Sequence, residues 1–300
     1  MVTQPNLLFE LLLLTNERPN RYAFKEVRST PATESYNHET MNIPIYQADA
    51  FTGELFQGNP AAVCPLDNWL PDAVLQSIAA ENNLSETAFF LPKGPDYQLR
   101  WFTPAIEVDL CGHATLATAH VLFEHLGYQE ASVNFHCRSG LLSVSREEDH
   151  YIMDFPTDII EPTLAPKVLT EALRATPLEV FAGREDFLIV LGSEAEVAAL
   201  QPDFRLLRQV KGRGVIVTAP GDAVDFVSRC FFPNAGIDED PVTGSAHTTL
   251  TPYWAERLGK QELTARQISR RGGEIRCTML GERVALAGKA VTYMEGVIRV

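Results

Sequence analysis

Hydrophobic and polar residues alternate over many short stretches after residue 40, and only a few stretches show helical spacing. Alternation or short apolar runs between turn residues predict strands at 45–51, 61–64, 87–91, 99–102, 132–137, 141–145, 151–155, 187–191, 214–218 and 224–231. Further strands are expected at 275–279, 283–287, 290–293 and 297–300. Shorter helices are predicted over 71–82, 166–176 and 194–200. Many strands around few helices predict an α+β fold.

Two longer helices resemble each other. One follows Gly112, carries almost no charge and stops at Gly127, and the other follows Gly244 and stops at Gly259. The two helices align at an offset of 132 residues, which is 244 − 112. At this offset Glu124 also aligns with Glu256, and Leu126 aligns with Leu258. The sequence therefore predicts an internal duplication. Because the first helix is apolar all round, we expect it to be buried on every side.

The starts of these two helices predict an anion site. Free backbone N–H groups and the positive end of the helix dipole attract negative charge. If the two halves of the chain face each other, both helix starts flank one cleft. A small molecule with a carboxylate is then the expected ligand.

The chain is expected to divide into three parts. Residues 1–40 are rich in Asn, Glu, Thr, Ser and Pro and predict a poorly ordered extension or a start codon assigned too early. One domain is predicted at 41–155 and a second at 166–300, with a proline-rich linker between them. The last strand could pack back on the first domain.

Composition and net charge argue against several classes of function. The net charge of −14 argues against nucleic acid as a partner, because phosphate contacts need clustered Lys and Arg. The longest apolar run is far shorter than the ~20 residues that a membrane span needs. The five cysteines are odd in number and scattered, which indicates a reducing, cytoplasmic location without structural zinc.

Two carboxylates stand out as candidates for acid-base chemistry. Glu86 lies in the predicted connector 84–86, where the simpler interpretation is a solvated loop residue. Asp240 precedes a helix start, where it could instead cap the helix. Asp238 and Glu239 are close in sequence, and neighbouring carboxylates raise one another's pKa, which favours acid-base work.

Other polar residues allow alternative interpretations. Cys111 and His113 could form a thiol–imidazole pair, but residues so close in a turn seldom point at each other. His113, His120 and His247 lack the spacing of metal ligands, so no metal site is expected. Residues 269–274 predict a turn, in which Arg270 or Arg271 could alternatively contact an anionic substrate.

Five motifs, in order along the chain, are similar to those of the phenazine-biosynthesis PhzF-like isomerases, which are relatives of diaminopimelate epimerase. They are Gly58-Asn-Pro60, Asn83-Leu-Ser-Glu-Thr-Ala88, Phe102-Thr-Pro104, Cys111-Gly-His-Ala-Thr115 and Glu239-Asp-Pro-Val-Thr-Gly-Ser245. The resemblance runs from about Met41 to Val300. It implies two similar domains, each a barrel-like sheet wrapped around a central helix, with the active site between them.

The resemblance also implies roles for particular residues. Glu86 would be the general base and acid, and Asp240 and His113 would assist proton transfer. The substrate-binding residues would be Ser85, Gly112, Gly244 and Ser245. The family needs no cofactor, and its members are commonly homodimers in biosynthetic pathways.

Three functional hypotheses remain at this point. The first is a cofactor-independent isomerase that moves a proton between carbons through Glu86. The second is an epimerase or dehydratase that uses Cys111 as a single thiol base, because the position of the second epimerase cysteine is Thr243 here. The third is a non-catalytic binder of a small acid on the same fold.

Overall fold

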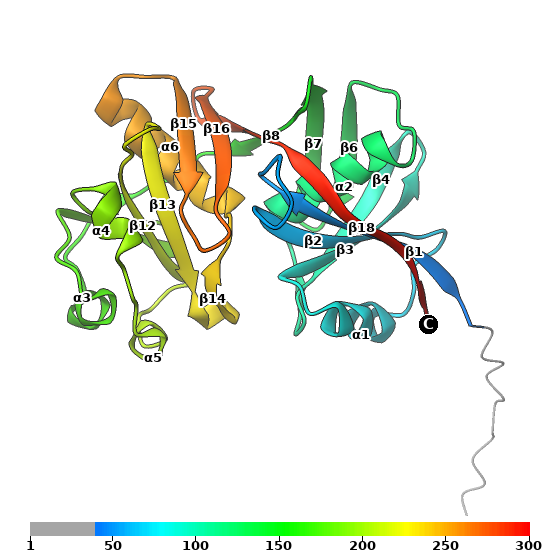
Figure 1. Cartoon of the computed structure of the whole chain (residues 1–300), viewed down its shortest axis with the longest axis horizontal. Coiled ribbons are helices and arrows are strands. Elements are labelled where there is room, and N and C mark those ends of the chain that lie inside the picture. The colour runs from blue at the N-terminus through cyan, green and yellow to red at the C-terminus, as the bar shows by residue number, and fades with distance from the viewer. Residues whose placement is uncertain (1–39) are drawn as a thin grey trace, which may run out of the picture. The chain divides into compact units, whose positions relative to one another are not determined.

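The computed structural model describes residues 40–300, which form one compact unit (Figure 1). The predicted N-terminal extension, residues 1–40, falls almost entirely outside the described residues. The first half of the unit contains β1 (Asn42–Ala50), β2 (Asn59–Pro65), α1 (Asp72–Asn82), β3 (Glu86–Lys93), β4 (Asp96–Phe102), β5 (Glu107–Val108), α2 (Gly112–Glu124), β6 (Ser132–Cys137), β7 (Gly140–Glu147) and β8 (His150–Pro156).

The second half is richer in short elements. It contains β9 (Glu161–Pro162), α3 (Lys167–Leu173), β10 (Glu179–Ala182), β11 (Asp186–Val190), α4 (Glu194–Ala198), α5 (Phe204–Leu207), β12 (Gly214–Pro220), β13 (Phe226–Phe232), the 3₁₀ turn η1 (Pro233–Ala235), β14 (Ile237–Asp240), α6 (Gly244–Leu258), β15 (Glu262–Gln267), β16 (Gly273–Met279), β17 (Arg283–Gly288) and β18 (Ala290–Arg299). None of the helices in residues 40–300 is long and apolar enough to cross a membrane.

The order of strand pairing is the same in both halves. In the first half β2 pairs parallel with β3, β3 antiparallel with β4, β4 parallel with β6, and β6 antiparallel with β7. In the second half β11, β12, β13, β15 and β16 repeat this series with the same directions. The long helices α2 and α6 occupy the same place in the two series. This order supports the predicted internal duplication, while the division at 41–155 and 166–300 stays a prediction.

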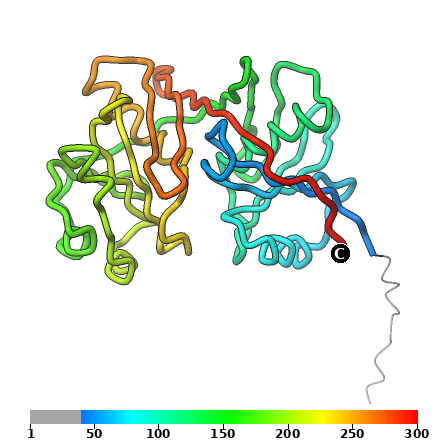
Figure 2. The backbone as a smooth tube through the Cα atoms, in the orientation of Figure 1, coloured from blue at the N-terminus to red at the C-terminus, as the bar shows by residue number. Residues whose placement is uncertain are grey.

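Two strand pairs join the halves into one continuous sheet. β8 pairs antiparallel with β17, and β18 pairs antiparallel with β1. Figure 2 shows the C-terminal segment, in red, leaving the second half and running alongside the first strand. The two ends of the described chain therefore lie together on the first half.

Helix α2 is the core of the first half. Every residue from His113 to Phe123 is buried, as the absence of charge over this stretch predicts. Strands β1, β2, β3, β7, β8 and β18 all contact it. The helix ends at Glu124, and the chain turns at Gly127, whose φ of 69° a residue with a side chain rarely adopts.

Several sequence-based expectations need correction. Glu86 is the first residue of β3 and does not lie in a connector. The two strands predicted at 290–293 and 297–300 are one continuous strand, β18, because pairing with β1 carries the chain through Gly296. Strands β5, β9, β10, β14 and β15 and helix α5 were not predicted. These elements are short, and β15 places Ala265 and Gln267 at core positions where β-branched residues are more usual.

Candidate active site

The first turns of α2 and α6 meet in the structure. A Cβ atom placed on Gly112 would lie 3.8 Å from the Cα atom of Gly244, and the reverse distance is also 3.8 Å. The residues before the two helices, Cys111 and Thr243, have extended backbone, and within residues 40–300 neither side chain caps its helix. Two sets of free N–H groups and two positive dipole ends therefore face the same point.

Glu86 and His113 form the first pair of ionisable groups beside this point. Glu86 begins β3, next to Ala61 on β2, and its exposed fraction is only 8%. Its Oε2 atom lies 3.1 Å from Nε2 of His113, at an angle outside hydrogen-bond geometry. Within the described part of the chain, this oxygen therefore has no hydrogen-bond partner. A buried carboxylate oxygen in this state can accept a proton from a ligand without first breaking a bond.

Asp240 comes from the other half of the chain and ends β14. Its Oδ1 accepts a hydrogen bond of 2.8 Å from Asn59 Nδ2, and its Oδ2 accepts one of 2.5 Å from Thr243 Oγ1. These partners are side chains, so Asp240 does not cap α6. Burial raises the pKa of Asp240 to about 6, and the nearby charge of Glu86 adds to this effect.

The neighbouring acids Asp238 and Glu239 do not join the site. Asp238 forms an ion pair of 2.7 Å with Arg208, and Glu239 forms one of 2.7 Å with Arg229. The expectation that crowded carboxylates tune the site is therefore wrong for these two. Both carboxylates are paired with arginines outside the site, and burial is the main reason for the raised pKa of Asp240.

Asn59 connects the two halves of the site, although its place in the sequence indicates only a turn. Its Nδ2 atom donates to Asp240 Oδ1 and, at 2.9 Å, to the carbonyl oxygen of Val242. The same atom lies 3.3 Å from Nδ1 of His113. Its position in the Gly58-Asn59-Pro60 motif was the only signal, because burial of a single polar residue is not visible in a sequence.

Gln267 was also missed, because β15 was not predicted. Its Oε1 atom accepts a hydrogen bond of 2.8 Å from the backbone N–H of Thr243, and its Nε2 atom donates to the carbonyl oxygen of Asp240 at 2.7 Å. This side chain is fully buried and holds the turn between Asp240 and the start of α6. It fixes the position of the carboxylate without belonging to either motif.

Cys111 and His113 do point at each other, contrary to expectation. Cys111 Sγ lies 3.5 Å from His113 Nδ1. Burial and the charge of Glu86 raise the pKa of Cys111 to about 11, so the thiol is protonated at neutral pH. Burial alone would lower the pKa of His113, but its interactions with Cys111 and Glu86 outweigh burial and raise the pKa well above 6.5.

The two predicted serines lie in different surroundings. Ser245 is in the first turn of α6, where its Oγ atom accepts a hydrogen bond of 3.2 Å from Arg213, and Arg213 is paired with Asp186. Ser85 is half-buried and directly precedes Glu86 at the start of β3. Both are therefore close in sequence to residues of the site.

Arg271, from the second half of the chain, forms hydrogen bonds with the first half. It donates to the buried carboxylate of Asp49 at 2.8 Å and to the carbonyl oxygens of Gln57 and Gly58 at 2.7 and 2.8 Å. Its Nε and Nη2 donors are thus bonded to structural partners, which favours the simpler interpretation of this segment over a substrate contact. Arg270 is exposed.

The remaining histidines are separate from His113. His120 contacts Tyr151 and Thr292, and His247 contacts the carbonyl oxygen of Thr243. Burial lowers the pKa of each to about 4. The group whose side chains could hold a metal ion is instead Glu86, Cys111 and His113, whose ligand atoms lie within 4.8 Å of one another.

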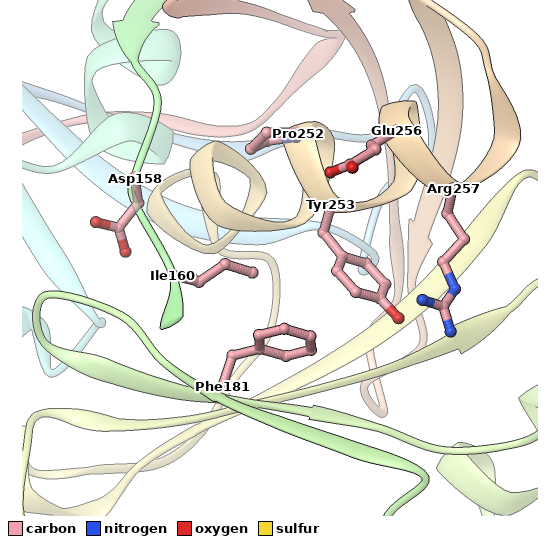
Figure 3. Close-up of a pocket in the computed structure, with 7 residues that line it drawn as sticks. All are labelled: Asp158, Ile160, Phe181, Pro252, Tyr253, Glu256 and Arg257. Atoms are coloured by element: carbon pink, nitrogen blue, oxygen red, sulfur yellow. The ribbon is translucent and has the colours of Figure 1, made fainter. Parts of the chain in front are cut away.

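Two cavities lie away from these residues. One of about 480 Å³ is lined by Ile160, Phe181 and Tyr253, whose side chains face one another across it (Figure 3). The other, of about 450 Å³, lies between α3 and α4. The carboxylates and the imidazole of the site are packed together beside the starts of α2 and α6.

Comparison with known proteins identifies the family of the chain. The family model for phenazine biosynthesis-like proteins matches residues 48–296, which is most of the chain. The chain belongs to this PhzF-like family. An uncharacterized isomerase of Pseudomonas aeruginosa is 55% identical over 258 residues, covering 86% of this chain and 99% of the relative. Because its relatives over nearly their full length are named isomerases, the PhzF-like chain is an isomerase.

Solved structures give the same family and place the fold in a wider group. A PhzF-family protein from Enterococcus faecalis has a TM-score of 0.84 and 49% identity, over 86% of this chain and 99% of the other. A hydroxyproline epimerase from Agrobacterium vitis has a TM-score of 0.57 at 10% identity, over 86% of this chain and 93% of the other. That likeness concerns the fold alone. The predicted α+β, epimerase-like fold is confirmed.

Proposed function

We propose that this PhzF-like isomerase moves a proton between carbon atoms of a small metabolite that carries a carboxylate, with Glu86 as general base and acid. The observation that carries the proposal is the buried Oε2 atom of Glu86, which has no hydrogen-bond partner within residues 40–300 and lies beside His113. A base placed in this way is free to take a proton from carbon.

The two helix starts would hold the substrate. Its carboxylate would accept hydrogen bonds from the first N–H groups of α2 and α6, beginning at Gly112 and Gly244. The same N–H groups would stabilise the negative charge that develops when a neighbouring C–H bond breaks. Ser245 and Ser85 would contact the parts of the substrate that extend from this point. Because the helix starts are in contact, substrate entry requires them to separate.

Proton transfer would then take place in two steps. Glu86 takes the proton from one carbon, and the electron pair of the broken C–H bond delocalises over the substrate. The protonated imidazole of His113 stabilises the added negative charge, and the nearby carboxylate of Asp240 favours that protonated form. The proton held by Glu86 exchanges with solvent, and Glu86 then protonates a different carbon, so that the product is an isomer and the enzyme is unchanged.

The alternative with Cys111 as base has one observation in its favour, the contact between its sulfur and the imidazole of His113. Its raised pKa, about 11, argues against it, because only the thiolate is a base. Under this alternative the Cys111→Ala variant loses turnover, and the Glu86→Gln variant keeps it. A non-catalytic binder would retain its ligand in both variants and exchange no hydrogen.

A screen in heavy water tests the proposal and does not require the product to be identified. Small amino and hydroxy acids are incubated with the full chain, and deuterium entering a C–H position is followed by NMR. Exchange that persists in Cys111→Ala and is lost in Glu86→Gln supports the proposal. Exchange that persists in Glu86→Gln overturns it. Homodimer assembly, a cytoplasmic location and a biosynthetic role stay predictions from the resemblance.

A further inference from the structure

Three different metal-binding side chains converge beside the two helix starts. Glu86, Cys111 and His113 come from the start of β3 and from the first turn of α2, and all three are buried. His113 Nε2 lies 3.1 Å from Glu86 Oε2 and 4.0 Å from Cys111 Sγ. Carboxylate, thiolate and imidazole are the three ligand types that Zn²⁺ prefers in proteins.

The distances between these atoms suit one small ion. With Zn–S bonds of about 2.3 Å and Zn–N and Zn–O bonds of about 2.0–2.2 Å, ligand atoms in a tetrahedral site lie roughly 3.3–3.6 Å apart. The observed separations of 3.1 and 4.0 Å lie on either side of this range. Small side-chain rotations would bring all three atoms into contact with an ion.

A further observation, the state of the Glu86 carboxylate, favours a cation in this group. Glu86 is more than nine-tenths buried, and its Oε2 atom has no hydrogen-bond partner among residues 40–300. Within the same residues, no Lys or Arg forms an ion pair with Glu86, so its negative charge has only His113 beside it. A buried and unsatisfied carboxylate oxygen favours a cation.

We propose that Glu86, Cys111 and His113 form a binding site for a thiophilic divalent cation such as Zn²⁺, with the fourth coordination position open. Binding breaks the S–H bond of Cys111 and one N–H bond of the protonated His113 imidazole, forms a sulfur–metal and a nitrogen–metal bond, and releases two protons to solvent. The carboxylate and the thiolate together neutralise the two charges of the ion. Soft thiolate coordination favours Zn²⁺ over Mg²⁺ or Ca²⁺.

The ion would act as an inhibitor. It would engage the oxygen of Glu86 and the imidazole of His113, and thereby compete with the substrate for both. This consequence for activity rests on the proposed function, whereas the metal site itself does not. Binding is therefore measured without substrate.

Cobalt is a suitable probe, because Co²⁺ bound to a thiolate shows a sulfur-to-metal charge-transfer band in the near ultraviolet. The full chain, kept reduced and freed of metal, is titrated with Co²⁺, and Zn²⁺ is then added as a competitor. We expect a band that saturates at one equivalent, is displaced by Zn²⁺ and is lost in Cys111→Ser. The matched control is Cys137→Ser, which alters the least buried of the cysteines and should keep the band.

The site is overturned if the unchanged chain shows no band, or if Cys111→Ser keeps it. If Cys111→Ser does not fold, the His113→Asn variant tests the site instead, because it should also lose the stoichiometric binding of Co²⁺. Inhibition by Zn²⁺ that a chelator reverses supports both proposals. A band at one equivalent without inhibition leaves the metal site standing and contradicts Glu86 as the base.

Discussion

Asn59 is the residue on which both halves of the site depend. Its amide nitrogen has two N–H bonds, which donate to the carboxylate of Asp240 and the carbonyl of Val242, and the same nitrogen lies 3.3 Å from Nδ1 of His113. Because the first two distances are shorter, Asn59 chiefly fixes Asp240 and the chain before α6. The amide thus sets the spacing between two groups that belong to different halves of the chain.

Replacing Asn59 with Ala should therefore lower both stability and activity. Two buried acceptors lose their donor, which costs about 1–3 kcal/mol in the free energy of unfolding. Urea denaturation measures this loss. Asn134→Ala is the control, because its half-buried side chain contacts Asp96 near the surface and should change stability less. Equal effects of the two variants would contradict the structural role of Asn59.

Asp240 predicts how stability depends on pH. Its folded-state pKa of about 6 lies above the ordinary value of 3.8, so the folded chain binds this proton more tightly than the unfolded chain. Its stabilising effect is complete below about pH 4 and is lost as the pH rises through 6. Between these values the unchanged chain should lose up to about 3 kcal/mol more than Asp240→Asn. Urea unfolding at several pH values checks this, and parallel pH profiles would refute it.

Some residues of the site could be predicted from the sequence, and others could not, for physical reasons. Glu86, His113 and Asp240 lie in compact motifs, and the structure brings them together. Gln267 could not be predicted as a site residue. In a segment with many polar residues, the sequence does not distinguish a buried glutamine from one on the surface. The contact between Cys111 and His113 was also missed, because it depends on the extended backbone of Cys111 before the helix.

At the scale of elements, the proposed ligand position lies at the starts of α2 and α6. A methyl group on Gly112 would make ordinary contacts, 3.8 Å from Gly244 and 3.9 Å from Phe155. It would, however, fill the space where the substrate carboxylate is proposed to bind. The backbone here needs no special glycine conformation, so the need for glycine comes from the ligand.

The Gly112→Ala variant should therefore fold normally and bind substrate poorly. We expect a change of at most about 1 kcal/mol in stability and a rise in KM of roughly tenfold or more, which corresponds to about 1.4 kcal/mol of lost binding. Steady-state kinetics and urea unfolding measure the two quantities. Gly53→Ala, on an exposed loop, should leave KM unchanged. A wild-type KM in Gly112→Ala would show that the carboxylate binds elsewhere.

Elements with a regular spacing of apolar residues could be predicted from the sequence. Elements that depend on pairing with other strands could not. The long helices and the strands around them follow from apolar spacing and from Gly and Pro positions. Strand β18 has exposed residues on both faces and owes its continuity to pairing with β1. Short β9 and β10 pair mainly with each other and with β11, so their existence depends on tertiary contacts.

At the scale of the whole molecule, Arg271 links the two halves. Its guanidinium group bonds to the buried Asp49 and to two backbone carbonyls of the first half. Removal of this partner in Arg271→Met leaves a buried carboxylate uncompensated and should cost about 3 kcal/mol or more. Arg270→Met is the matched control and should change stability by no more than about 0.5 kcal/mol. Thermal unfolding compares the two, and an equal shift would exclude this link.

The central claim concerns the buried carboxylate of Glu86, and isotope exchange tests it most directly. With a substrate identified in heavy water, the rate of deuterium entry is compared between the unchanged chain, Glu86→Gln and the exposed control Glu81→Gln. We predict a loss of about 10²–10⁴-fold in Glu86→Gln and a normal rate in Glu81→Gln. Exchange at the normal rate in folded Glu86→Gln would contradict the claim.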